Sequence, residues 1–489
     1  MATTPAPTLE SVRDDRSFFG HPRGLGLLFA AEMWERFSFY GMRGLLVLYL
    51  VNALKWSDGD AARLYGNYMS LVYLTPLVGG YIADRLLGTR NSLVIGGIVI
   101  AAGHFVMAID NMATFYTGMG LVIVGTGFFK PNVSTMVGQL YAAGDPRRDA
   151  GFTVFYMGIN LGAFLAPFVC STLGEKVGWH YGFAAAGVGM VLGTVSYVLL
   201  RDKYLPGIGL APGRGAAATA GAGGESPSRP WHGIVGGAAG LGVAALASSG
   251  NWVALLMGAV IGGAIGTAVL GTHGEERKRV IALFIVVTFI VLFWAAFEQA
   301  GSSMNLFADR HTDRTIGSFL MPTGWFQSVN SLFLLLFATV FAGLWLRLSK
   351  AGREPPTAFK MVIGLFLLGL GFVALVIGGR LVDAGGKVSP VFLLAAYLFH
   401  TWGELCVSPV GLSYVTKVAP VRFASLLMGV WFLANSAAGL VGGAIAAMTE
   451  TVKSQAAFFA IPMATSIGAS LLLLLLVPLL RRLTASVQA

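Results

Sequence analysis

The chain consists largely of long apolar stretches separated by short polar segments. Crossing a bilayer as a helix takes about 20 predominantly apolar residues. Hydrophobic residues make up 55% of the 489 positions and charged residues only 11%, against about 25% charged in a soluble globular protein. Candidate spans in the first half are 25–54, 61–83, 91–109, 112–138, 150–172 and 178–200; those in the second half are 279–305, 322–346, 361–379, 390–416, 421–447 and 455–480. We therefore expect an all-α membrane protein.

A Gly/Ala/Pro/Ser-rich segment at 207–230 lies between the two series of spans and has the composition of a flexible linker. Two shorter apolar segments, 232–249 and 252–271, follow it and contain no Lys, Arg, Asp or Glu. We expect them to form a lipid-facing hairpin. The predicted organisation is a six-helix bundle at 1–203, a linker with two extra helices at 204–278, and a second six-helix bundle at 279–489.

The basic residues predict how the chain is oriented. The chain has 33 Lys and Arg residues against 23 Asp and Glu, and most of the basic ones fall in loops on the side of the N-terminus. Cytoplasmic loops of membrane proteins carry an excess of Lys and Arg, so both termini are expected to be cytoplasmic. The first apolar run is too long for a cleavable signal sequence. Cys170 and Cys406 lie in separate apolar stretches, which indicates buried thiols rather than a disulfide.

Seven charged side chains fall well inside predicted spans. A charge at the centre of a membrane helix costs about 2.5–3.5 kcal/mol, so function explains seven of them better than helix-packing salt bridges do. They are Glu32, Glu35, Arg36, Arg43, Lys130, Glu298 and Glu404. At about 100° per residue, one face of the first helix carries Glu32, Glu35, Arg36, Tyr40 and Arg43.

Depth along the spans suggests two ion pairs. Arg43 and Glu298 reach a similar depth in the outer half of the membrane, and Lys130 and Glu404 both lie in the inner half. Alternating access needs one closure on each side of a central site, so these pairs are predicted to gate the two sides. Four carboxylates face three bases, and a desolvated, unpaired carboxylate takes up a proton. Proton coupling follows as a hypothesis, with Glu35 and Glu298 as the leading carriers.

Eight motifs in both halves of the chain resemble those of the proton-dependent oligopeptide transporter (POT) family of the major facilitator superfamily. The first-span run EMWERFSFYGMR (32–43) is similar to the ExxER signature of this family, and GYIADRLLGTR (80–90) to the superfamily's loop motif. The others are GTGFFKPN (125–132), FYMGINLGAF (155–164), FWAAFEQAGSS (293–303), WFQSVN (325–330), GELCVSP (403–409) and WFLAN (431–435). The resemblance implies the major facilitator fold, with the two extra helices that are typical of bacterial members.

The resemblance also implies a function: proton-coupled import of di- and tripeptides across the bacterial inner membrane. The peptide carboxylate would meet Arg36, Arg43 and Lys130, and its amino terminus would meet Glu404, helped by Asn160 and Asn330. Residues implied to bind substrate are Arg36, Tyr40, Arg43, Tyr73, Lys130, Tyr156, Asn160, Trp294, Glu298, Asn330, Glu404, Ser408 and Trp431. Those implied in proton coupling are Glu32, Glu35, Arg36, Lys130 and Glu298. Protons would be the coupling ion, with no metal, cofactor or nucleic acid, and the monomer would be functional.

Phe39 departs from the family pattern, because many members have a tyrosine there; an altered substrate preference is expected at most. An intramembrane enzyme is disfavoured because the sequence has no HExxH or GxSxG motif. A channel or a nutrient sensor stays open, because the same fold could bind a peptide without moving it. Nitrate transport is a further alternative, but a negative group opposite a positive one suits a zwitterion better than a simple anion.

Overall fold

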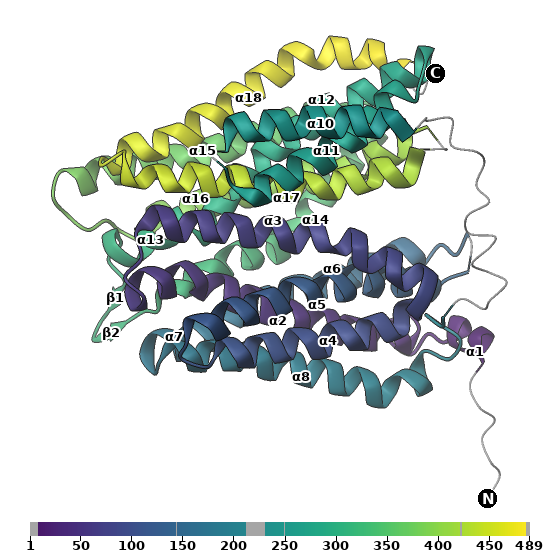
Figure 1. Ribbon diagram of the computed structural model, residues 1–489, viewed down its shortest axis with the longest axis horizontal. Helices are drawn as coiled ribbons and strands as arrows, with labels where there is room; N and C mark the ends of the chain where they lie inside the picture. The colour runs from purple at the N-terminus through teal and green to yellow at the C-terminus, as the bar shows by residue number, and fades with distance from the viewer. Residues whose placement is uncertain (1–7, 143, 212–229, 249, 421–422, 486–489) are drawn as a thin grey trace, which may run out of the picture. The chain divides into compact units, whose positions relative to one another are not determined.

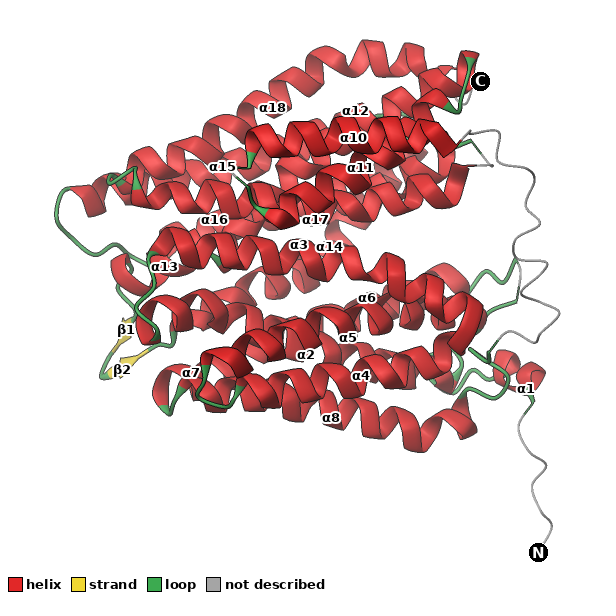
Figure 2. Cartoon of the chain, in the orientation of Figure 1, coloured by secondary structure: helices red, strands yellow, loops and turns green. Residues whose placement is uncertain are grey.

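The computed structural model describes residues 8–142, 144–211, 230–248, 250–420 and 423–485. These residues are nearly all helical (Figure 2). Most of the predicted linker, at 212–229, lies outside them. The helices are α1 Leu9–Asp14, α2 Arg23–Leu48, α3 Asp58–Ile82, α4 Gly88–Met107, α5 Met112–Gln139, α6 Arg148–Ala166, α7 Thr172–Lys176, α8 Trp179–Tyr204, α10 Pro230–Ala247, α11 Trp252–Leu270, α12 Gly274–Phe297, α13 Ser303–His311, α14 Gln327–Lys350, α15 Thr357–Asp383, α16 Val391–Val418, α17 Ala424–Ala447 and α18 Gln455–Leu483 (Figure 1).

Shorter elements continue or connect these helices. The π-helical turns are Tyr49–Ala53, Ala83–Leu87 and Pro167–Ser171, and the 3₁₀ turns are Glu298–Gly301, Thr323–Phe326 and Met448–Glu450. Strands β1 (Thr315–Ile316) and β2 (Phe319–Leu320) form a short antiparallel hairpin. Several helices begin where a polar side chain caps the first free backbone N–H groups. Examples are Asn111 before α5, Asn251 before α11 and Ser454 before α18.

Twelve segments of the described chain are long and apolar enough to cross a membrane. That number treats α3 and α4 as a single segment of 50 residues and omits α2, whose buried charges lower its hydropathy. With these three counted separately there are fourteen helices. The predicted all-helical fold class with fourteen membrane helices is confirmed, and the predicted span at 112–138 matches α5 to within one residue.

Contacts between residues divide the chain into two units. Unit 1 comprises Met1–Tyr49, Leu74–Gly221 and Met321–Leu332, and unit 2 comprises Leu50–Tyr73, Ala222–Leu320 and Phe333–Ala489. The boundary therefore runs through two helices: the first half of α3 belongs to unit 2, and the start of α14 belongs to unit 1. These units follow contacts rather than chain order, so the domain boundaries expected at 203 and 279 remain a prediction.

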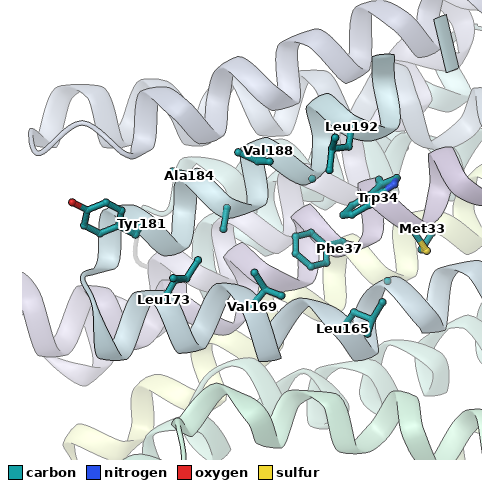
Figure 3. Close-up of a pocket in the computed structure, with 13 residues that line it drawn as sticks. Met33, Trp34, Phe37, Leu165, Val169, Leu173, Tyr181, Ala184, Val188 and Leu192 are labelled. Atoms are coloured by element: carbon teal, nitrogen blue, oxygen red, sulfur yellow. The ribbon is translucent and has the colours of Figure 1, made fainter. Parts of the chain in front are cut away.

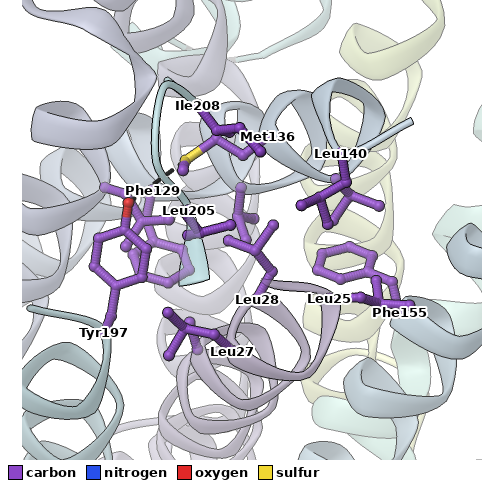
Figure 4. Close-up of a cluster of buried hydrophobic side chains, with 14 of the residues drawn as sticks. Leu25, Leu27, Leu28, Phe129, Met136, Leu140, Phe155, Tyr197, Leu205 and Ile208 are labelled. Carbon is purple, nitrogen blue, oxygen red and sulfur yellow. Dashed lines mark hydrogen bonds between the residues drawn. The ribbon is translucent and has the colours of Figure 1, made fainter. Parts of the chain in front are cut away.

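The core of unit 1 is formed by apolar side chains from α2, α4, α5, α6 and α8 (Figure 4). Leu25, Phe129 and Met136 are inaccessible to solvent. The Tyr197 hydroxyl lies among them, 3.6 Å from the sulfur of Met136. The α2 residues of this core, from Leu25 to Ala31, lie in its first turns, and the charged residues begin directly after them at Glu32.

The segment before α2 is fastened to the loop between α5 and α6. Arg147 donates to the backbone oxygen of Arg13 at 2.7 Å and forms an ion pair with Asp145 at 2.8 Å. His21 Nδ1 lies 2.9 Å from the Tyr141 hydroxyl. The N-terminal segment is therefore part of the folded unit 1.

In unit 2, α10 and α11 lie side by side as a hairpin (Figure 1). Glycines let the two backbones approach closely: a Cβ on Gly240 would lie 2.0 Å from the backbone oxygen of Gly258. Only 6% of the α10 span is buried, and Leu246 is 91% exposed. The expected hairpin is confirmed, and most of the α10 surface is free to face lipid.

Candidate functional site

Three charged residues of α2 form a buried cluster. Arg36 Nε lies 3.1 Å from Glu32 Oε1 and also forms an ion pair with Glu35. Glu32, Glu35 and Arg36 are 3%, 1% and 3% exposed. Lys130 of α5 is close enough for its charge to act on the Glu32 carboxylate. The structure therefore brings together four of the seven intramembrane charges within unit 1.

Aromatic rings lie beneath both arginines of α2. The Arg36 guanidinium is 5.0 Å from the centre of the Phe39 ring, and that of Arg43 is 5.5 Å from the Tyr40 ring. Both distances suit a cation–π interaction, which operates within about 6 Å. Many members of the family that the sequence resembles have tyrosine at this position. Phe39 therefore keeps the aromatic ring beside Arg36 and lacks only the hydroxyl.

A glycine of the FYMGINLGAF motif lets α6 cross α2 at this cluster. A Cβ on Gly162 would lie 2.2 Å from the backbone oxygen of Met33 and 3.1 Å from Cβ of Arg36. Two residues earlier, Asn160 is 5% exposed and donates to the backbone oxygen of Tyr156 at 3.0 Å. Tyr156 itself is 38% exposed. The close helix approach explains why this motif contains glycine rather than a larger residue.

The start of α14 is anchored in unit 1 by residues that the sequence did not single out. Glu175 of α7 accepts hydrogen bonds from the backbone N–H of Thr323 at 2.7 Å and of Gly324 at 2.9 Å. Trp325 Nε1 donates to the Thr172 hydroxyl at 2.9 Å. These contacts fix the position of the WFQSVN motif (325–330) in unit 1. The motif ends at Asn330, which is half-buried. The sequence did not indicate a role for Glu175, because this residue lies just after the predicted span 150–172, where a charged residue is expected.

Glu298 occupies the point in unit 2 where α12 gives way to a 3₁₀ turn. It is 8% exposed and accepts a hydrogen bond from the Tyr65 hydroxyl of α3, with 2.9 Å between the oxygen atoms. The neighbouring Gln299 donates to the backbone oxygen of Gly442 at 2.9 Å, which fixes the turn against α17. Tyr65 was not among the predicted site residues.

Gly301, in the motif FWAAFEQAGSS, lies against the Tyr65 side chain. A Cβ on Gly301 would lie 2.1 Å from the Tyr65 hydroxyl oxygen. The glycine of FWAAFEQAGSS therefore leaves the space that the hydroxyl fills. The sequence alone shows the small residue but not which side chain uses the space.

Other predicted site residues of unit 2 lie on α12, α16 and α17. Glu404 is 8% exposed and Trp431 is 7% exposed, whereas Trp294 and Ser408 are half-buried. The ring of Trp294 packs edge-on against Phe297 at 5.1 Å. For Trp294, helix packing is thus observed, and substrate contact stays a prediction.

The predicted site residues are distributed over both units. Unit 1 contains Glu32, Glu35, Arg36, Tyr40, Arg43, Lys130, Tyr156, Asn160 and Asn330; unit 2 contains Tyr73, Trp294, Glu298, Glu404, Ser408 and Trp431. Each predicted ion pair, Arg43 with Glu298 and Lys130 with Glu404, takes one member from each unit. Both pairs therefore remain predictions.

An apolar groove of about 590 Å³ lies in unit 1 between α2, α6, α7 and α8 (Figure 3). Trp34, Phe37, Val169 and Leu192 are among the side chains that line it. None of the predicted site residues does so. A lining without charge cannot compensate for the desolvation of a zwitterion, so this groove is not the candidate site.

Known proteins resemble this chain over nearly its whole length. A sequence profile of the POT family matches residues 90–205 and 257–464. The "Uncharacterized transporter YclF" of Bacillus subtilis (strain 168) is 40% identical, with 96% of each chain covered. The "Di-/tripeptide transporter" of Lactococcus lactis subsp. cremoris is 33% identical, with 95% of this chain and 97% of the relative covered. A crystal structure of peptide transporter POT, as a single-residue variant in complex with alafosfalin, is 36% identical with a TM-score of 0.82, covering 98% of this chain and 100% of the other.

The fourteen helices and the buried intramembrane charges thus define a multi-pass membrane protein with the transporter fold of the major facilitator superfamily. The chain belongs to the POT family. Its named relatives are transporters rather than enzymes.

Proposed function

We propose that this protein is a proton-coupled symporter that imports di- and tripeptides by alternating access. Membership of the POT family and the peptide transporters among its relatives support peptides as the substrate. The bacterial relatives support a location in the bacterial inner (plasma) membrane. The distribution of Lys and Arg supports an orientation with both termini in the cytoplasm. The proposed functional form is the monomer in the bilayer.

The observation that carries this proposal is the buried cluster of Glu32, Glu35 and Arg36 beside Lys130. Desolvated charges at this depth are expensive unless they are paired or bind something. In the proposed mechanism Arg36, Arg43 and Lys130 receive the peptide carboxylate through charge-assisted hydrogen bonds, which are the strong ones in a low-dielectric site.

Glu404 receives the amino terminus of the peptide in this mechanism, helped by Asn160 and Asn330. The distance between the charged ends then selects short peptides, whereas their side chains vary freely. Tyr40, Tyr73, Tyr156, Trp294 and Trp431 offer apolar faces with polar tips to those side chains. Glu404 would repel a simple anion such as nitrate, so the charge arrangement favours the zwitterionic peptide.

Protons are the proposed coupling ion, and no resident cofactor is needed. Four intramembrane carboxylates face three bases, so one carboxylate is left to gain and lose a proton as the bases exchange partners. Glu298 is the proposed carrier, because it is buried at the junction of α12 and the 3₁₀ turn. Its protonation would release Arg43 and open the outer closure.

Uptake of a labelled dipeptide into liposomes that contain the purified protein tests this function. A gradient with acid outside should drive accumulation, and equal uptake without a gradient would contradict symport. Glu298→Gln should abolish gradient-driven uptake but retain counterflow, because exchange of peptide for peptide needs no net proton movement. Loss of both would assign Glu298 to binding or folding instead. Glu275→Gln is the matched control, because Glu275 lies on α12, the helix that leads to Glu298, and its side chain is 56% exposed and paired with Lys278.

A further inference from the structure

The hydroxyl of Tyr65 is a direct neighbour of the proposed proton carrier. It donates to Glu298 Oε2 at 2.9 Å, and the two side chains are 1% and 8% exposed. Tyr65 lies on the half of α3 that belongs to unit 2. The hydrogen bond therefore links that half of α3 to the end of α12 through the group proposed to change its charge.

Other polar contacts hold the same half of α3 in unit 2, and they differ in kind. Near the start of the helix, Arg310 donates to both oxygens of Asp58, at 2.6 and 2.8 Å. Their side chains are 38% and 23% exposed, and ion pairs that water reaches contribute little to stability. Further along the helix, Ser70 and Ser436 form a neutral hydroxyl pair at 3.0 Å. Among these contacts, the bond of Tyr65 combines deep burial with an acidic acceptor.

We propose that Tyr65 is a positioning residue that links the protonation state of Glu298 to α3. A hydrogen bond to an ionised carboxylate is roughly twice as strong as one between neutral groups. While Glu298 is ionised, the hydroxyl holds its carboxylate against α3. When Glu298 takes up a proton, the same contact weakens, and the first half of α3 loses one of the contacts that hold it in unit 2. This inference rests on the proposed function, because it takes Glu298 as the group that is protonated.

Few other ionisable groups face Glu298 from the described elements packed around it. The described helices α11 and α17 contain none. His400 of α16 contacts the neighbouring residue, with its ring 6.3 Å from that of Phe297. Other ionisable residues on α13, on α16 and on the unit 2 part of α3 include Asp309, Arg310, His311, Tyr397, Glu404, Cys406, Asp58, Asp60, Arg63 and Tyr68. Arg43 of unit 1 is the predicted ion-pair partner. Replacing Tyr65 by Phe removes one hydroxyl and leaves all of these ionisable residues in the protein.

Replacing Tyr65 by Phe removes the hydroxyl and keeps the ring. Without the donor, the ionised form of Glu298 loses a stabilising contact. The pH of half-maximal dipeptide uptake should therefore move upward by about one unit, which is a tenfold change in proton affinity, and counterflow should persist. Tyr197→Phe is the matched control: it removes a buried tyrosine hydroxyl that contacts Met136 in unit 1, and it should leave the midpoint unchanged. An unchanged midpoint in Tyr65→Phe would overturn the proposal.

Thermal unfolding of the purified protein between pH 5 and 8 tests the contact without transport. The melting temperature of the wild type should exceed that of Tyr65→Phe at high pH, and the difference should narrow as the pH falls. In a Glu298→Gln background, Tyr65→Phe should no longer change the pH dependence. A difference that stays constant over this pH range would show a purely structural role for Tyr65. Because unfolding needs no peptide, a failure of the proposed transport function would be recognised separately.

Discussion

Gly162 offers a stringent test of how the charged cluster on α2 is positioned. In Gly162→Ala, the added Cβ would lie 2.2 Å from the backbone oxygen of Met33 and 3.0 Å from the backbone nitrogen of Phe37. Both atoms belong to the α2 backbone, so no side-chain rotation can relieve the contact. The two helices must move apart instead, at the level of the Glu32–Arg36 ion pair.

The expected cost follows from two opposing effects. Extra atoms in a well-packed interior typically cost about 1–3 kcal/mol. Alanine is favoured over glycine inside a helix by roughly 1 kcal/mol. Because a contact of 2.2 Å with backbone is far inside normal van der Waals distance, we place the cost in the upper half of that range. The net destabilisation should then be on the order of 1–2 kcal/mol.

Gly120→Ala is the matched control, because a Cβ at Gly120 of α5 meets nothing within 4 Å. Thermal unfolding in detergent should show a lower melting temperature for Gly162→Ala and an equal or higher one for Gly120→Ala. Dipeptide binding should also weaken in Gly162→Ala, because Arg36 moves with α2. If both variants unfolded and bound peptide as the wild type does, the close approach of α6 to α2 would be refuted.

Two further predictions concern contacts outside the charged cluster. Glu175→Ala leaves the backbone N–H groups of Thr323 and Gly324 without their acceptor, so it should destabilise the fold by about 1–2 kcal/mol; Glu175→Gln keeps one acceptor oxygen and should retain most of the stability in thermal unfolding. Burial, followed by a nearby arginine charge, lowers the pKa of His21 below its usual value of 6.5. The unfolded chain therefore binds the proton more readily, and the contact of His21 with Tyr141 contributes stability that is full above pH 6.5 and is lost as the pH falls below it. The protection of amides in the segment before α2, measured relative to their intrinsic exchange rates, should thus fall between pH 7 and 5 in the wild type and lose this pH dependence in His21→Gln, whereas an identical fall in both would exclude the histidine.

Much of the fold could be predicted because a bilayer imposes a simple rule on each segment. A membrane helix must satisfy its own backbone hydrogen bonds and expose apolar side chains, so long apolar runs located most of the helices. The contact of Arg36 with Glu32 was equally local, because residues four positions apart share one face of a helix. The extra hairpin followed from composition, since it carries no charge at all.

Contacts between distant segments were beyond this kind of reasoning. Tyr65 and Glu298 are 233 positions apart, and Glu175 and Thr323 are 148 apart. A tyrosine in an apolar helix is compatible with many neighbours, and only the folded structure brings Tyr65 to the 3₁₀ turn that contains Glu298 and Gly301. The same holds for Gly301, whose missing side chain is visible in the sequence although the hydroxyl that fills the space is not.

The sequence by itself therefore determined the number of membrane helices, the charges within them and the family. The tertiary structure alone decided that the first half of α3 groups with unit 2 and the start of α14 with unit 1. It also decided which hydroxyl meets Glu298. The physical reason is that hydropathy and helical periodicity act within one segment, whereas the pairing of helices depends on complementary shapes that arise only when remote segments pack together.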